Sequence, residues 1–211
     1  AGADDRHLLR AVRAQWPILL TGVAVVGTVG FVWNGLFNFY VSYLVAEKSV
    51  APGTARTLLT VVFAAGLPAF LLTGRLADRV PNVPLLLAVI GGFAATVSAL
   101  TLATGLLAVV TVSVLLGYAV HSLFPVVDTY LLASLPDHHR ASAYTVYSAS
   151  MMVVQAQGSL AVGRLVGGGL AYDTVFAWFA GGLVVGLVGL GGLHVTGHIP
   201  AGRVPGTPAG E

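Results

Sequence analysis

The stretch Gly74-Arg75-Leu76-Ala77-Asp78-Arg79 decides the fold, because it is a short charged segment between two long apolar runs. The runs cover residues 54–73 and 84–102 and carry almost no charge. Three charged side chains this close together must lie in water or at a polar surface, since a charge inside the hydrocarbon core is costly. Each run is near the length of about 20 residues that crosses a bilayer as a helix. We therefore predict two membrane helices that turn at this point.

The composition of the whole chain agrees with a membrane protein. Of its 211 residues, 56% are hydrophobic and 9% are charged, whereas soluble domains carry about a quarter charged residues. The ten Lys and Arg side chains and the eight Asp and Glu side chains are scattered over the loops. This pattern favours inside-facing loops over a nucleic-acid surface. The chain has no cysteine, which excludes disulfide and thiolate chemistry.

Apolar runs recur along the chain and predict an all-α, polytopic membrane protein. We expect six transmembrane helices, near residues 17–44, 54–76, 80–103, 106–135, 141–166 and 174–195. Gly66-Leu67-Pro68 predicts a kink in the second helix, and Pro125 predicts one in the fourth. Residues 1–16 are expected to form a cytoplasmic lead-in, residues 17–195 the helix bundle, and residues 196–211 a flexible cytoplasmic tail.

The basic residues predict the orientation of the bundle. Six spans place both termini on one side, and seven basic residues then share that side: Arg6, Arg10, Arg13, Arg75, Arg79, Arg140 and Arg203. The other side has Lys48, Arg56 and Arg164. Because Lys and Arg gather in cytoplasmic loops, we expect a cell-membrane protein with cytoplasmic termini. Arg56 and Arg164 lie at helix ends, where snorkelling to the interface and an outer gate or anion contact are alternative roles.

A short pattern occurs twice and predicts an internal repeat. Pro52-x-x-x-Arg56 opens the second span and Gly74-Arg75-Leu76 closes it; Pro136-x-x-x-Arg140 and Gly163-Arg164-Leu165 bracket the fifth span in the same way. The pattern pairs the middle helix of residues 17–103 with that of residues 106–195, and these helices run in opposite directions. Inverted three-helix repeats are associated with secondary transporters.

The charged stretch also resembles the loop motif of the major facilitator superfamily, Gly-x-Leu-Ala-Asp-Arg/Lys-x-Gly-Arg/Lys-Arg/Lys. Residues 74–79 match, whereas Pro81 replaces the second glycine and Asn82 and Val83 replace the basic pair. In that family the motif joins the second and third helices of each six-helix half on the cytoplasmic side. With the eroded motif and a start without methionine, the resemblance implies the C-terminal half of a twelve-helix transporter, whose partner is an N-terminal six-helix half.

The same loop is a candidate inner gate. Asp78 can accept hydrogen bonds from backbone N–H groups at the start of the next helix, near its positive dipole end. Arg75 and Arg79 can pair with Asp78 and with a facing helix, and Gly74 permits close approach. The resemblance implies that these four residues hold the inner gate against the other half. An ordinary positive-inside turn is the alternative.

The fourth span has two titratable residues, His121 and Asp128. Tyr118, His121, Pro125 and Asp128 share one helix face. An acid inside a membrane usually faces a cavity or a partner, so the pair is a candidate proton-coupling site, with Tyr118 and His121 also facing solute. An interfacial Asp128 and a hydrogen-bonded packing His121 are the alternative.

Two polar and aromatic stripes predict the solute site. Asn34 and Asn38 are one turn apart on the first helix, with Phe31 on nearly the same face. The fifth helix has a second stripe, consisting of Tyr144, Tyr147, Met151 and Gln155. The resemblance implies that the first, second, fourth and fifth helices face a central cavity. We expect an amphiphilic or aromatic solute, held by stacking and amide hydrogen bonds. Polar contacts between helices are the alternative.

The remaining motifs predict no further chemistry. His194 and His198 are four residues apart but lack a third ligand, so we expect no metal and no cofactor. Gly163-x-x-x-Gly167 and Gly182-x-x-x-Gly186 predict helix-packing surfaces. The chain has no Gly-x-Ser-x-Gly, metalloprotease or nucleotide-binding motif, so we do not expect an enzyme. We predict a half-transporter that moves a small organic solute by alternating access, with proton-driven efflux preferred. A facilitator, an importer and a scaffold without transport are alternatives.

Overall fold

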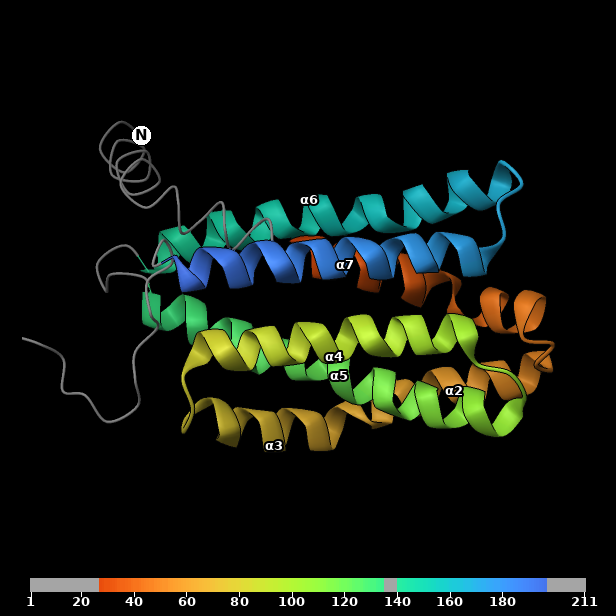
Figure 1. The fold of residues 1–211 in the computed structure, drawn as a ribbon, viewed down its shortest axis with the longest axis horizontal. Helices are drawn as coiled ribbons and strands as arrows, with labels where there is room; N and C mark the ends of the chain where they lie inside the picture. Colours follow the sequence, from red (N-terminus) through yellow and green to blue (C-terminus); the bar gives the residue numbers. More distant parts are fainter. Residues whose placement is uncertain (1–26, 135–139, 197–211) are drawn as a thin grey trace, which may run out of the picture.

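The computed structural model describes the backbone of residues 27–134 and 140–196, and their side chains except those of residues 128–134, 140–144 and 146–147. The described residues form helices joined by short connections, and no strand occurs among them. After the helix Gly27–Glu47 come six helices: α2 (Pro52–Ala64), α3 (Gly66–Ala77), α4 (Asn82–Leu102), α5 (Leu106–Ser134), α6 (Arg140–Gly167) and α7 (Tyr172–Val195). The helices lie lengthwise beside one another (Figure 1), which confirms the predicted all-α class.

Five stretches of the described residues are long and apolar enough to cross a membrane. They are Gly27–Glu47, Pro52–Ala77, Asn82–Leu102, Leu106–Val127 and Tyr172–Val195. Helix α6 occupies the predicted fifth span, but its residues are the least apolar of the labelled helices. The polytopic class is therefore confirmed. The residues predicted to begin the first span, 17–26, lie outside the described residues.

The second span is broken between α2 and α3, as Gly66-Leu67-Pro68 predicts. Helix α2 ends at Ala64 and α3 begins at Gly66, with Ala65 between them. Pro68 has no backbone N–H and cannot donate to the residue four positions earlier, which interrupts the ladder of helical hydrogen bonds. The break divides one membrane span into two segments that can face different neighbours.

Glycines bring two pairs of helices into backbone contact. A Cβ on Gly158 of α6 would overlap the carbonyl oxygen of Phe31 and lie 3.0 Å from the backbone nitrogen of Gly35 in the first helix. A Cβ on Gly117 of α5 would overlap the carbonyl oxygen of Val62 in α2. At these contacts the missing side chain is what allows the helices to approach.

The glycine pairs predicted from sequence behave differently. Around Gly182 and Gly186 of α7 no described atom lies within 4 Å of an added Cβ. Around Gly163 the ring of Phe39 lies at 3.4 Å, while Gly167 has open space. The prediction that Gly182 and Gly186 pack helices together is wrong among the described residues, because this face of α7 meets no neighbouring helix there.

The charged stretch is mostly helical. Helix α3 continues through Ala77, so only Asp78 and Arg79 stand in the turn. The predicted cap by Asp78 is wrong: Asp78 ends α3, and α4 begins after Pro81 without a side-chain cap. Pro81 stands in its place as the residue before the first helical position of α4.

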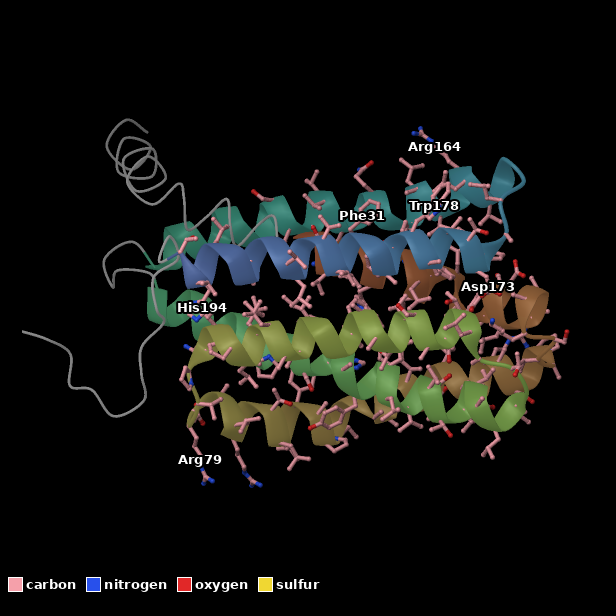
Figure 2. The ribbon with its side chains drawn as sticks, viewed as in Figure 1. Phe31, Arg79, Arg164, Asp173, Trp178 and His194 are labelled. Atoms are coloured by element: carbon pink, nitrogen blue, oxygen red, sulfur yellow. The ribbon has the colours of Figure 1, made fainter. Side chains whose placement is uncertain are left out.

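Different polar and charged residues lie at the two ends of the bundle. Arg79 and His194 lie at one end, and Arg164 and Asp173 lie at the other (Figure 2). This arrangement agrees with the predicted placement of Arg79 and Arg164 on opposite sides of the membrane.

Candidate functional site

Six rings from four helical segments gather at the break in the second span. We call this set the aromatic cluster: Trp33 and Phe37 of the first helix, Phe63 of α2, Phe70 of α3, and His121 and Phe124 of α5. The Phe37 and Phe63 ring centroids are 4.5 Å apart, and those of Phe70 and Phe124 are 5.8 Å apart. Phe63, Phe70 and Phe124 are exposed on the surface of the described chain. The cluster therefore presents aromatic surface outside the bundle.

His121 lies at the centre of the aromatic cluster. Its ring centroid is 5.6 Å from that of Trp33 and 5.8 Å from that of Phe63, and the residue is buried. Nδ1 is 2.7 Å from the carbonyl oxygen of Gly117. Because a carbonyl oxygen only accepts, Nδ1 carries the proton and donates it, which leaves Nε2 as an acceptor in the neutral ring.

The break in the second span is also where His121 fits. A Cβ on Gly66 would lie 2.6 Å from Cγ of the His121 ring, so only glycine leaves room for the ring there. At the next residue of α5, Ser122 accepts a hydrogen bond of 2.9 Å from Oγ1 of Thr73 in α3. Both hydroxyl side chains are buried. These contacts hold α3 against α5 beside the histidine.

The first helix carries a polar face next to the aromatic cluster. The Oδ1 atom of Asn34 is buried and has no hydrogen-bond partner among the described residues. Asn38 is exposed, and its Nδ2 donates to the backbone oxygen of Asn34 at 2.8 Å. One turn before Asn34, a Cβ on Gly30 would lie 2.6 Å from Nε2 of Gln155 in α6. Gln155 therefore packs against the first helix one turn before Asn34, and Asn38 follows one turn after it.

Other predicted solute residues lie elsewhere or outside the described side chains. The ring of Phe31 packs against Phe179 of α7 at 5.2 Å and is not part of the cluster. Tyr118 on α5 is 38% exposed, whereas its neighbour His121 is 7% exposed. The side chains of Asp128, Tyr144 and Tyr147 lie outside the described part of the chain, as does His198, although Asp128 is in α5 and both tyrosines are in α6.

The predicted gate residues are at the end of α3. Arg75, Asp78 and Arg79 are all exposed, and Arg79 points away from the bundle (Figure 2). Among the described residues the ion pair joins Lys48 and Asp173, so the predicted pairing of Asp78 with the neighbouring arginines is not formed. The loop therefore offers its charges to the surroundings.

Sequence reasoning missed a polar site at the opposite end. Nζ of Lys48 is 3.0 Å from Oδ1 and 3.1 Å from Oδ2 of Asp173, and it donates to the carbonyl oxygen of Thr101 at 2.6 Å. The hydroxyl of Tyr43 donates to Oδ1 of Asp173 at 2.6 Å. The Lys48 side chain is 7% exposed and that of Asp173 is 37% exposed.

A second contact runs between the same two helices. The backbone N–H of Tyr172, at the start of α7, donates to Oε1 of Glu47 at 2.9 Å. We call the whole set the polar junction: Tyr43, Glu47, Lys48, Thr101, Tyr172 and Asp173. The available signal was a pair of opposite charges at the ends of two spans on one side of the membrane. The predicted first span ends at residue 44 and the predicted last span begins at residue 174, so Glu47, Lys48 and Asp173 all lie outside the predicted helices.

Comparison with known proteins gives the family. The sequence model described as Major Facilitator Superfamily matches residues 19–207. The crystal structure of a mutant of the peptide transporter POT in complex with sulfate superposes with a TM-score of 0.73 at 21% identity, covering 89% of this chain and 40% of that one. The mutant in complex with alafosfalin gives 0.70 at 19% identity with the same coverage.

The two transporter structures share the fold, and the chain spans 40% of their length. The search among curated proteins finds no match. Since the family model covers most of the sequence, the chain belongs to the major facilitator superfamily.

Proposed function

We propose that the chain is the C-terminal half of a secondary active transporter that moves a small organic solute by alternating access. The observation that carries the proposal is the polar face of the first helix, where Asn34 and Asn38 lie one and two turns after Gly30, the residue against which Gln155 packs. A buried oxygen without a partner is costly, so the Oδ1 atom of Asn34 is suited to a solute N–H or O–H.

The proposed architecture is two inverted repeats, residues 17–103 and 106–195, between a lead-in at 1–16 and a tail at 196–211. In such transporters the halves rock against each other around a central site. The exposed aromatic rings of α2, α3 and α5 then face the N-terminal half and the solute. Gly74, Arg75, Asp78 and Arg79 form the inner gate with that half.

The proposed solute is amphiphilic or aromatic. The rings of Phe63, Phe70 and Phe124 offer stacking surface, and the Nε2 atom of His121 and the amides of the first helix offer hydrogen bonds. Asp128 is the proposed proton-coupling residue, with His121, and proton-driven efflux is the preferred direction. A facilitator or importer of a metabolite, and a membrane scaffold without transport, remain the alternatives.

Transport by the whole transporter, with both halves, in proteoliposomes tests this function. The probes are ethidium, a planar aromatic cation, and a dipeptide, because the similar structures belong to a peptide transporter. We expect a pH gradient to drive accumulation of one probe. Asp128→Asn is expected to abolish gradient-driven accumulation while probe exchange continues, since an amide cannot carry the proton.

Three outcomes count against parts of the proposal. If neither probe moves faster than through empty liposomes, the scaffold alternative gains. Movement that ignores the pH gradient favours a facilitator. If Asp128→Asn leaves both the rate and its pH dependence unchanged, Asp128 has no coupling role.

We also propose that both termini lie in the cytoplasm of a cell-membrane protein. Arg79 and Arg164 stand at opposite ends of the bundle (Figure 2), and this part of the chain has no cysteine. Single cysteines at these positions should therefore label cleanly with an impermeant maleimide. We expect Arg164→Cys to react in intact cells and Arg79→Cys to react only after permeabilisation. The reverse pattern would overturn the orientation.

A further inference from the structure

We propose that the polar junction is a permanent joint between the two repeats. It keeps the end of the first helix in contact with the start of α7 while the half-transporter moves. Residues 17–103 contribute Tyr43, Glu47, Lys48 and Thr101 to it, and residues 106–195 contribute Tyr172 and Asp173. The inference takes its division into repeats from the proposed function, but the contacts themselves do not depend on transport.

Each charge in the polar junction occupies a helix end. Lys48 follows the first helix and donates to Thr101 in the last turn of α4, a carbonyl group that has no partner within its own helix. Asp173 stands in the first turn of α7, where the helix dipole favours an acid. Glu47 accepts the hydrogen bond of a backbone N–H at the same helix start. Opening the junction would strip partners from three helix ends together.

Lys48 has little conformational freedom. Its ammonium group contacts both carboxylate oxygens and one carbonyl oxygen, and lies 5.5 Å from the centre of the Tyr43 ring. The side chain is 7% exposed. A gate residue has to exchange partners in each cycle, whereas a buried ammonium group pulled from these partners would remain unpaired, which is costly.

The turns on either side of the junction each contain one residue with a positive φ. Ser49 has a φ of 53° and Gly169 a φ of 97°. The residue after each donates a backbone hydrogen bond back across the turn: Val50 to Leu44, six positions back, and Leu170 to Leu165, five positions back. The bond of Leu170 is that of the Schellman arrangement, in which the left-handed residue is usually glycine. A serine in that conformation persists where its surroundings hold it, and the neighbouring Lys48 is part of the junction that does so.

The first helix is also held to the second repeat far from the polar junction. Gly35 lies against the backbone oxygen of Gly158 in α6, and a Cβ there would be 2.8 Å from the Phe179 ring of α7. The helix is therefore fixed to the second repeat at two levels along its length. This double attachment favours movement of the half as one body.

Distances between spin labels test the joint. Nitroxides on Ala51→Cys and Ala171→Cys, two exposed positions beside the junction, are measured in the full-length chain in lipid nanodiscs, with and without ethidium. A reference pair at the other end uses the exposed positions Arg79→Cys and Val195→Cys. We expect one narrow distance for the junction pair under both conditions.

Variants of Lys48 make the test specific. Lys48→Met is expected to abolish the narrow peak of the junction pair and leave the reference pair unchanged, and Asp173→Asn is expected to do the same. Lys48→Arg, which keeps the charge, is expected to retain the peak. Two distances in the unaltered junction, or a peak that survives Lys48→Met, would refute the joint. If Lys48→Met broadens the distance distributions of both label pairs, its effect is not confined to the junction, and the proposal is refuted. The distance measurement does not require transport, so it tests the joint even if the transport proposal fails.

Discussion

Gly158→Ala is expected to be among the most damaging single-methyl substitutions in the chain. The new Cβ would overlap the carbonyl oxygen of Phe31 and meet the backbone nitrogen of Gly35 at 3.0 Å. Backbone atoms in a helix cannot rotate away, so α6 and the first helix must separate. Overpacking typically costs about 1–3 kcal/mol, and we expect a loss of about 3 kcal/mol here. Thermal unfolding in detergent should show a melting temperature lower by about 10 °C.

A matched substitution on α7 isolates the cause. Around Gly182 no described atom lies within 4 Å of an added Cβ, and alanine favours a helix over glycine by about 1 kcal/mol. Gly182→Ala should therefore leave the melting temperature unchanged or raise it. If both variants melt at the temperature of the unaltered protein, the close contact between α6 and the first helix does not exist in the membrane.

Lys48→Met is expected to give the second large effect. Methionine keeps the apolar length of the side chain, but Asp173 loses its cation and the carbonyl oxygen of Thr101 loses its donor. Breaking a fully buried ion pair costs about 3–5 kcal/mol. The Asp173 side chain is 37% exposed, so water offsets part of the loss, and we expect about 2 kcal/mol. The melting temperature should fall by about 5 °C.

Arg56→Met is the control for this substitution. Arg56 is an exposed residue in the first turns of α2, the helix that follows Lys48. Exposed substitutions usually change stability by no more than about 0.5 kcal/mol. If Arg56→Met and Lys48→Met destabilise equally, the general loss of a cation from this end explains the effect, and the specific pairing of Lys48 does not.

The helices could be predicted from sequence because the bilayer imposes their length. Apolar runs of membrane-spanning length predicted where the helices lie, and Pro68 predicted the break in the second span because its missing N–H acts locally. The turn after α3 was harder. The match of residues 74–79 to the loop motif does not indicate that Gly74–Ala77 remain helical. Nor does it indicate that Pro81, not Asp78, precedes the next helix.

Contacts between distant residues could not be predicted in this way. Lys48 and Asp173 are 125 residues apart, and nothing local to either indicates that their helices end side by side. The same holds for glycine: Gly158 and Gly182 look alike in sequence, but only Gly158 meets another backbone. His121 is predicted to be important from its place in an apolar run, whereas three of its four aromatic neighbours, Trp33, Phe63 and Phe70, come from other helices that only the fold brings to it.

The contact of α6 with the first helix has a consequence for biosynthesis. Helix α6 has Gln155, Gln157 and Arg164 and is the least apolar of the labelled helices. Its transfer from the translocon into lipid without a partner helix is therefore less favourable than that of the other helices. The first helix is synthesised earlier and is already present when α6 emerges from the ribosome. Its glycines at 30 and 35 offer α6 a protein surface in place of lipid, which makes the entry of the fifth span depend on the first.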